Sequence, residues 1–318
     1  MAPRSADSAT LLKQARSGDR GALARLLTIV ERGGPAAREV GRIVARAGGS
    51  AHVVGVTGAP GAGKSTLTGA LIAHLRARGD EVAVLAIDPS SPFTGGAILG
   101  DRVRMQDHAT DVGVFIRSMA TRGHLGGLSL ATSEAIRVLD ATGRPWIVVE
   151  TVGVGQVEVE IAGKADTTVV VVNPGWGDAV QANKAGLMEV ADIFVINKAD
   201  RPGSDATRRD LEAMLDMSEH GEWRPPIVET SAIDGAGVAD LWSHIERHRT
   251  WATESGTLAD RRRFRVQSEL RTIVGRRIEE RAREACSGAR WDELVDAVGD
   301  GRIDPWTAAD ELLRSVGA

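Results

Sequence analysis

The fold of this chain is decided by the stretch Gly58-Ala59-Pro60-Gly61-Ala62-Gly63-Lys64-Ser65. It matches the spacing G-x-x-x-x-G-K-S, it follows a β-branched run, Val53–Thr57, and it opens a helical pattern that ends near Arg78. In that setting the glycines let backbone N–H groups face phosphate oxygens, and the helix N-terminus adds about half a positive charge. The stretch and the following Thr66 therefore predict a phosphate-binding loop. Lys64 is expected to reach the β- and γ-phosphates, and the Ser65 hydroxyl is expected to ligate Mg²⁺.

The surrounding sequence, from about residue 52 to residue 250, alternates short apolar runs with helical patterns. Buried strands joined by helices form a mostly parallel sheet that is covered on both faces. We therefore predict an α/β fold of the P-loop NTPase type. The expected strands are Val53–Thr57, Val82–Ile87, Val112–Ile116, Trp146–Val149, Thr168–Val172, Ile193–Ile196 and Pro226–Glu229.

Helical patterns without strands flank this region on both sides. Apolar residues recur at helical spacing over residues 8–47, and an Arg-rich amphipathic pattern runs over residues 257–285, followed by short helices around Pro305. We expect an N-terminal helical extension over residues 1–50, a nucleotide-binding domain over residues 51–252 and a C-terminal helical arm over residues 253–318.

A second motif, Asn197-Lys198-Ala199-Asp200, follows the predicted strand Ile193–Ile196. An Asp carboxylate can accept from the N1–H and the exocyclic amine of guanine, while a Lys stem covers the ring and the Asn supports the loop. Adenine cannot offer those donors, and each lost hydrogen bond in a buried site costs about 1–3 kcal/mol. The motif predicts selectivity for GTP and GDP. A Ser231-Ala232-Ile233 turn after the next strand is a further candidate for contacting the base through backbone N–H groups.

Three acidic residues lie where strands are expected to end. Asp88 ends the second strand, Asp101 follows a Gly-rich loop, and Glu150 ends the strand Trp146–Val149. Ligands of open α/β sheets bind at the carboxyl ends of the strands, and Mg²⁺ takes oxygen ligands. With Ser65, these three acids are the candidate magnesium ligands. The alternative for each Asp is that it caps a helix or a turn.

Two glycine-containing loops follow later strands at the same edge. Gly153-Val154-Gly155-Gln156 comes after Glu150, and Gly175-Trp176-Gly177-Asp178 leads to Lys184. Gln156 is a candidate for orienting the attacking water, and it is an equally good candidate for anchoring its loop. Lys184 is notable because the chain has only five lysines among 39 basic residues. Together with Lys64 and Asp88, these two residues are the catalytic candidates.

Composition excludes several classes of protein. The net charge is −4, so the balance of charge indicates neither a nucleic acid nor an anionic membrane as a partner. Cys286 is the single cysteine, which rules out a disulfide within the chain and a Cys-based metal cage. The polar N-terminus and strand-sized apolar runs predict no targeting segment and no membrane span. We expect a cytoplasmic protein.

Taken together, these motifs resemble the MeaB/MMAA GTPases, also catalogued as ArgK or LAO-transport-like proteins. The most specific matches are Asp88-Pro89-Ser90-Ser91, Gly95–Arg102 and Glu150–Gln156, beside the phosphate loop and Asn197–Asp200. The resemblance implies a G domain with an N-terminal helical extension and a C-terminal dimerisation arm. It also implies a GTP-hydrolysing chaperone of a cobalamin-dependent acyl-CoA mutase, usually methylmalonyl-CoA mutase, that gates adenosylcobalamin loading, protection and reactivation.

In that family Asp101 and Glu150 match the magnesium positions, and residues 174–184 are similar to a loop that communicates with the partner. Other functions remain in competition at this stage. A nickel-type metallochaperone GTPase would need clustered Cys or His ligands, and a kinase of transport proteins would need ATP. A protein that binds GTP without useful turnover is a third alternative. For the Arg-rich helix we favour a contact in a homodimer. A solvated helix is the second choice, and a nucleic-acid-binding helix is the third.

Overall fold

The computed structural model of the chain describes residues 7–88, 108, 110–120, 125–151, 163–175, 189–218 and 221–315. The described residues form two compact units, one up to Arg262 and one from Arg263 onward. The first unit contains the sheet and the nucleotide motifs. The boundary between the units falls within a long helix, α11 (Thr257–Ala285).

The first unit is built on a seven-stranded sheet in the order β3-β2-β4-β1-β5-β6-β7. Each neighbouring pair is parallel, which confirms the predicted α/β architecture. The strands are β1 (His52–Gly58), β2 (Val82–Asp88), β3 (Val114–Ala120), β4 (Trp146–Thr151), β5 (Thr167–Val172), β6 (Ile193–Asn197) and β7 (Ile227–Thr230).

Six of the seven predicted strands lie within two residues of their observed bounds, whereas the third overlaps β3 (Val114–Ala120) but begins two residues and ends four residues too early. Val112–Ile116 was predicted, but β3 begins at Val114, and Val112 is 82% exposed. The Asp111 carboxylate accepts from the Gly113 N–H at 2.8 Å, which fixes a turn before the strand. A side chain that bonds to the backbone two residues on competes with the strand ladder, and the apolar pattern does not reveal it.

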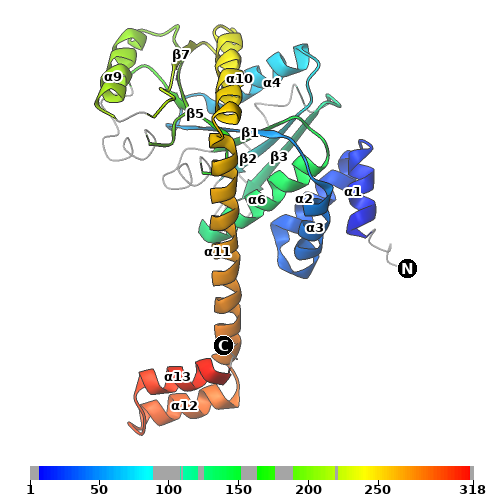
Figure 1. The fold of residues 1–318 in the computed structure, drawn as a ribbon, viewed down its shortest axis with the longest axis vertical. Coiled ribbons are helices and arrows are strands. Elements are labelled where there is room, and N and C mark those ends of the chain that lie inside the picture. Colours follow the sequence, from blue (N-terminus) through cyan, green and yellow to red (C-terminus); the bar gives the residue numbers. More distant parts are fainter. Residues whose placement is uncertain are drawn as a thin grey trace. The chain divides into compact units, whose positions relative to one another are not determined.

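Helices cover both faces of the sheet, as Figure 1 shows. Helices α4 (Lys64–Ala77) and α10 (Val238–Glu254) pack on one face, in a core with β1 residues Val54 and Val56. Helix α6 (Leu125–Ala141) packs on the other face, in a core with Val53. Helix α9 (Ser204–Met217) packs against β5 and β6. Successive side chains of a strand point to opposite faces of the sheet, and both faces are covered by helices. The apolar runs are therefore buried along their whole length.

The N-terminal helices belong to the same unit. They are α1 (Ser8–Arg16), α2 (Arg20–Arg32) and α3 (Gly34–Ala47). Leu23 and Leu26 share a core with Phe115 and Met119 of β3, so these helices continue the core of the sheet. The second unit contains the rest of α11 and a pair of helices, α12 (Ala289–Gly299) and α13 (Pro305–Ser315), which pack through Leu294, Ala308 and Leu312. The predicted long helix over residues 257–285 is confirmed.

Candidate nucleotide-binding site

The phosphate loop lies between β1 and α4, at the carboxyl edge of the sheet. Gly58 has a φ of +133°, and a Cβ there would come within 2.0 Å of the Val171 carbonyl oxygen on β5. Gly63 has a φ of +91°, and a Cβ there would lie 2.5 Å from the side-chain nitrogen of Asn197. A side chain at either position would meet both a strained backbone and a close neighbour. These two glycines are therefore required by the local structure.

Lys64 begins α4 and is buried, with 7% of its surface exposed. Its ammonium donates to the carbonyl oxygens of Gly58, at 2.8 Å, and Ala59, at 3.0 Å. The side chain therefore curls back over the loop that is expected to hold phosphates. An ammonium in this position places a full positive charge beside the helix N-terminus, where an anion is favoured.

Ser65 and Glu150 meet at the same edge. The Ser65 hydroxyl donates to Glu150 Oε1 at 2.5 Å, and Glu150 is fully buried near the end of β4. Just behind them, the Thr151 hydroxyl donates to the Thr57 hydroxyl at 3.1 Å, which ties β4 to β1. The contact between Ser65 and Glu150 brings an oxygen-bearing side chain from the first turn of α4 and one from β4 together next to the phosphate loop. Hard oxygen donors of this kind are the ligands that Mg²⁺ prefers.

Asn197 joins the second motif to the phosphate loop. It is buried at the end of β6, and its amide nitrogen donates to the Ala62 carbonyl oxygen at 2.9 Å. Its amide oxygen accepts from the Thr230 hydroxyl, at 3.1 Å, and from the Ala232 N–H, at 3.2 Å. One side chain thus links the loops that follow β1, β6 and β7. Asn197 thus supports the Asn197–Asp200 loop in the structure, and base recognition by this loop stays a prediction.

The next residues of this motif are exposed or half-buried. Lys198 donates to the Gly61 carbonyl oxygen at 2.7 Å, and its φ of 59° is the single positive φ outside glycine in the described residues. Asp200 is exposed. A backbone in a sparsely populated region that persists next to a site is a frequent mark of function. The Lys198 side chain therefore lies over the phosphate loop, and the Asp200 carboxylate is accessible to a ligand.

The Ser231-Ala232-Ile233 turn completes this side of the site. The Ser231 hydroxyl donates to the Asp234 carboxylate at 2.8 Å, and Ile233 is 83% exposed. The Ala232 N–H that was expected to face a base donates to Asn197 in the structure. Its observed role is to fix the turn against the base-reading loop.

The remaining four candidates lie partly or entirely outside the described residues. Asp88 ends β2 at the nucleotide edge, but its side chain lies outside the described part of the structure. Asp101, Gln156 and Lys184 lie entirely outside the described residues. Their expected roles stay predictions.

The sequence and the fold of this chain are similar to those of known proteins. A family model described as methylmalonyl-CoA mutase-associated GTPase MeaB matches residues 23–287. The chain belongs to the MeaB family. It is 52% identical to a putative GTPase of Pyrococcus abyssi over 311 residues, which is 96% of each chain. It is 34% identical over 268 residues to a mouse mitochondrial protein named methylmalonic aciduria type A homolog, covering 82% of this chain and 65% of the mouse protein.

A solved structure described as LAO/AO transport system kinase has the same fold. Its TM-score against this MeaB-family chain is 0.72, at 28% sequence identity, and the match covers 100% of each chain. The family assignment thus confirms the resemblance predicted from the motifs, and the relatives are named GTPases. In the described residues no helix has the length and apolar content needed to cross a membrane.

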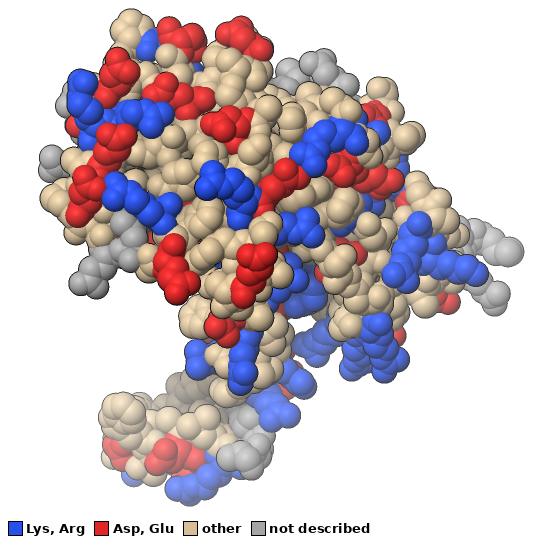
Figure 2. Space-filling model, turned by 45° about the horizontal axis from the view of Figure 1, so that its top comes forward, with Lys and Arg blue, Asp and Glu red and all other residues tan. Residues whose placement is uncertain are grey.

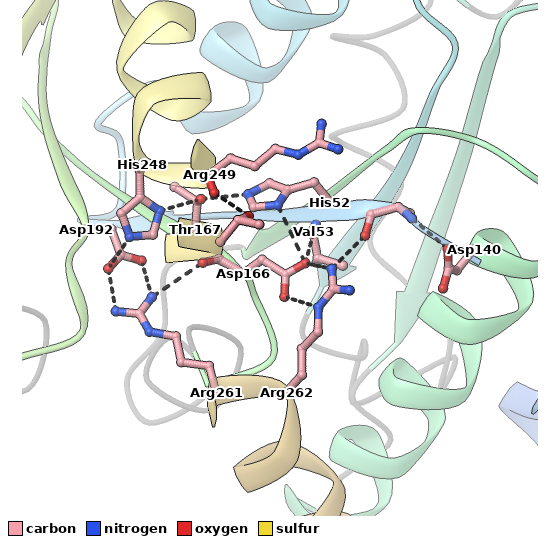
Figure 3. A network of polar contacts seen from close by, with 12 residues as sticks. His52, Val53, Asp140, Asp166, Thr167, Asp192, His248, Arg249, Arg261 and Arg262 are labelled. Atoms are coloured by element: carbon pink, nitrogen blue, oxygen red, sulfur yellow. Dashed lines mark hydrogen bonds and ion pairs between the residues drawn. The ribbon is translucent and has the colours of Figure 1, made fainter. Parts of the chain in front are cut away.

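Sequence reasoning missed a second polar cluster, which lies at the opposite edge of the sheet (Figure 3). Asp166 precedes β5 and Asp192 precedes β6, and both are buried. Arg262 donates to Asp166 at 2.6 and 3.1 Å, and Arg261 donates to Asp192 through two nitrogens, each at 2.8 Å. These arginines come from the first turns of α11. We call this network the basal cluster.

The two aspartates also fix the register of the strands. The Val53 N–H donates to Asp166 at 3.0 Å, and the Thr168 N–H donates to Asp192 at 2.8 Å. An Asp directly before a predicted strand was a signal in the sequence that could have identified them. Nothing in the sequence indicated that their partners would come from a helix that begins 65 or more residues later.

Two histidines complete the basal cluster. The Thr167 hydroxyl lies 2.8 Å from His52 Nε2 and 2.7 Å from His248 Nδ1. Burial lowers the pKa of His52 to about 4, although the Asp166 carboxylate opposes this shift. Burial alone would raise the pKa of Asp192, but the hydrogen bonds from His248 and Arg261 outweigh it and bring the pKa below its usual value. At neutral pH His52 is therefore uncharged and Asp192 is ionised.

Proposed function

We propose that this chain binds GTP at the carboxyl edge of the sheet, hydrolyses it to GDP and phosphate, and acts as a chaperone of a cobalamin-dependent acyl-CoA mutase. The observation that supports this most directly is the Asn197 side chain, which joins the base-reading loop to the phosphate loop. That contact holds the loop after β6 against the loop after β1, which supports a single site made of the proposed guanine-reading and phosphate-reading motifs. One guanine nucleotide can then span both motifs.

The roles of the residues follow from their positions. Lys64 and the N–H groups at the start of α4 would hold the β- and γ-phosphates, and Lys198 would cover the base. Asp200, which is exposed, would accept from the guanine N1–H and the exocyclic amine. The Lys64 ammonium now donates hydrogen bonds to the carbonyl oxygens of the loop. With a γ-phosphate bound, it would donate to the phosphate oxygens instead.

The donor set also fits Mg²⁺. Ser65 and Glu150 would hold it, because their oxygens already lie 2.5 Å apart at the edge of the phosphate loop. Asp101 and Asp88 remain proposed partners. When bound, the ion supplies positive charge that stabilises the leaving diphosphate.

The client is inferred from the family. The matching family is described as associated with methylmalonyl-CoA mutase, and the mouse relative bears the name methylmalonic aciduria type A homolog. A mutase that contains cobalamin is therefore the partner we propose, with methylmalonyl-CoA mutase as the first choice. The chaperone would gate the loading, protection and reactivation of the adenosylcobalamin that the client uses, in the cytoplasm.

A homodimer through the arm is part of the same proposal. On α11 the large apolar side chains are exposed by 48–65%, and they recur at helical spacing. Their residues are Phe264, Val266, Leu270, Val274 and Ile278. A stripe of this kind is stabilised when a second apolar helix covers it. Size-exclusion chromatography with light scattering would report a dimer, and Leu270→Glu with Ile278→Glu would give a monomer.

The experiment that tests the function is a panel of cobalamin-dependent acyl-CoA mutases from the same organism. Each purified mutase is mixed with the protein, and complex formation and GTP turnover are measured with and without it. We expect one mutase to bind and to accelerate turnover. If no mutase forms a complex or accelerates turnover, the chaperone role is wrong. The GTPase assignment is tested separately, by GTP turnover of the free protein.

Two alternatives predict different results in the same assays. A kinase of transport proteins, the activity named for the similar LAO/AO structure, would turn over ATP. A nickel metallochaperone would bind Ni²⁺, and the described residues contain no group of three or more potential metal-binding side chains. Equal turnover of ATP and GTP would contradict the guanine site, and stoichiometric nickel binding would favour the second alternative.

A further inference from the structure

The N-terminal helices carry an excess of positive charge. Residues 7–47 contain eight basic and four acidic side chains, whereas the whole chain has a net charge of −4. Seven of the eight basic residues are exposed. Figure 2 shows the Lys and Arg side chains gathered over this end of the first unit, at the right of the view. The exposed basic residues are Lys13, Arg16, Arg25, Arg32, Arg38, Arg42 and Arg46.

Three of the four acidic residues are occupied elsewhere. Asp7 accepts from the Thr10 N–H and Asp19 from the Gly21 and Ala22 N–H groups, so both cap their helices. Glu31 accepts from Arg117 of β3 at 2.5 Å and is half-buried. Glu39 pairs with Arg42 at 3.2 Å, so these helices expose seven basic side chains against three acidic ones, those of Asp7, Asp19 and Glu39. The excess of positive charge is therefore a property of the surface, not only of the sequence.

Three of these arginines form a row on one helix. Arg38, Arg42 and Arg46 follow each other at four-residue spacing on α3, which places them about 6 Å apart along one side of the helix. Like charges at this spacing destabilise a helix by about 0.2–0.5 kcal/mol for each pair. The helix dipole favours a cation only in the last turn, where Arg46 lies. The ion pair between Arg42 and Glu39, three residues earlier, offsets part of this repulsion. We call this row the α3 arginine row.

The composition of the helices favours one class of partner. α1, α2 and α3 contain no Phe, Trp or Tyr, so they offer no ring on which the bases of a single strand could stack, whereas contacts to the phosphates of a duplex need no ring. None of the large exposed apolar side chains in the described residues lies on these helices, so nothing is available to enter a membrane. An acidic protein surface needs neither feature. Asp or Glu at four-residue spacing on a partner helix would match the α3 arginine row.

The basic face is firmly joined to the nucleotide domain. The Arg20 guanidinium donates to the Asp111 carbonyl oxygen at 2.7 Å, just before β3, and Arg117 of β3 donates to Glu31 and to the Thr28 hydroxyl. The helices also share their core with β3. Helix α3 packs on α2 and α6, so a protein bound to the α3 arginine row would contact a helix that shares the core of the nucleotide-binding unit.

From these observations we infer that the exposed face of α1–α3, centred on the α3 arginine row, docks an acidic surface of the client protein. The inference rests on the proposed function, because the client is the mutase proposed above. It adds to that proposal the place on this chain and the chemistry by which the client is recognised. Electrostatic contacts of this kind mainly accelerate association and select the partner.

The test measures the affinity of whichever mutase binds the unaltered protein in the panel described above. Arg38→Gln, Arg42→Gln and Arg46→Gln are combined in one variant, and binding is followed at about 0.1 M salt, where charges within about 10 Å still interact. We expect about tenfold weaker binding, mostly through slower association, with GTP turnover of the free protein unchanged. Replacing the same three residues by Lys should keep the affinity within about twofold.

A matched control removes the same charge elsewhere. Arg209, Arg224 and Arg247 are exposed on other parts of the first unit, and their replacement by Gln should leave the affinity within about twofold. Equal weakening by this control, or full affinity of the α3 variant, would overturn the inference while the client remains established. Loss of binding to anionic vesicles or to duplex DNA, with mutase affinity intact, would assign the face to those partners instead. If no mutase binds, the proposed client fails and this docking face fails with it.

Discussion

The two edges of the same sheet are built in opposite ways. At the carboxyl edge, glycines, backbone carbonyl groups and two lysines surround a loop, and Lys64 and Lys198 bond to the carbonyl oxygens of that loop. At the amino edge, the basal cluster pairs each buried aspartate with an arginine that donates two hydrogen bonds. The first edge presents donors that a ligand can engage, and the second pairs its charges within the protein.

This difference in hydrogen bonding distinguishes polar clusters that can bind a ligand from those that stabilise the fold. A buried carboxylate that is fully hydrogen-bonded by its own chain fixes structure, because removing it from water is compensated within the protein. A loop of N–H groups at a helix N-terminus is incomplete until an anion arrives. Both edges contain charged residues, so charge alone does not distinguish them. Changes at the carboxyl edge should therefore affect nucleotide binding, whereas changes at the amino edge should affect folding.

The largest effect is expected at the phosphate loop. Lys64→Ala should weaken GTP binding by on the order of a hundredfold or more, because a buried charge-assisted contact to the phosphates is lost. The midpoint of thermal unfolding should stay nearly unchanged. Fluorescence titration with a labelled nucleotide measures the affinity. Lys13→Ala, on an exposed face of α1, is the matched control. Unchanged binding by Lys64→Ala would show that the phosphate loop has been assigned wrongly.

At the opposite edge, Arg262→Met should act on folding instead. The substitution leaves the fully buried Asp166 carboxylate with one donor fewer at each oxygen. We expect a loss of about 3 kcal/mol in the free energy of unfolding. This is the lower end of the range for breaking a buried ion pair, because Arg262 is partly exposed. Urea denaturation measures this. GTP affinity well below the unfolding midpoint should be unchanged.

A second variant checks that this loss comes from the buried charge. Asp166→Asn combined with Arg262→Met should recover part of the stability, because no unpaired charge is buried. Arg224→Met, which breaks an exposed ion pair with Asp216, should change the free energy of unfolding by less than about 1 kcal/mol. A loss for Arg262→Met as small as that of Arg224→Met would mean that the basal cluster contributes little.

The base-reading loop should show an intermediate effect. Asp200→Asn replaces an acceptor by a donor opposite two N–H groups of guanine, and we expect about tenfold to hundredfold weaker GTP binding. Xanthosine triphosphate carries a carbonyl oxygen in place of the exocyclic amine, so its binding should improve in the variant. Competition titration with the two nucleotides measures the ratio. An unchanged ratio would exclude Asp200 from base recognition, while the unfolding midpoint serves as the control.

The smallest effect expected is a pH dependence from the basal cluster. His52 has a pKa of about 4 when folded and about 6.5 when unfolded, so the unfolded state binds more protons between those values. Stability should therefore fall as the pH drops below about 6.5, by about 2 kcal/mol between pH 7 and pH 5, and level off below about pH 4. His52→Gln should remove this part of the dependence, whereas His244→Gln should not. An identical slope in both variants would contradict the burial of a neutral His52.

Much of the nucleotide edge could be predicted because its signals are local. A phosphate loop needs its glycines, lysine and serine next to one another, and the loop is always bounded by a strand and a helix. The same holds for Asn197–Asp200 and for the apolar runs of β1, β5 and β6. The turn at Asp111, which moved the start of β3, was also local, but its side-chain hydrogen bond does not alter the apolar pattern.

The amino edge could not be predicted in the same way. Asp166 and Arg262 are 96 residues apart, and Asp192 and Arg261 are 69 residues apart. Arg261 and Arg262 belong to a stretch with ten arginines between residues 257 and 290, and nothing in their spacing distinguishes them from the exposed ones. Only the packing of the start of α11 against the ends of β5 and β6 selects these two.

The sequence by itself determined the fold class and the family, and it predicted the phosphate loop and the guanine motif, because each depends on residues that are neighbours along the chain. The tertiary structure decided that Asn197 ties the two nucleotide loops together, that Glu150 meets Ser65, and which charges are buried and which are exposed. Those facts depend on strand order and helix packing, which bring distant residues within hydrogen-bonding reach. Whether a charged residue binds a ligand, stabilises the core or recognises a partner is decided by its surroundings, and the linear pattern does not contain them.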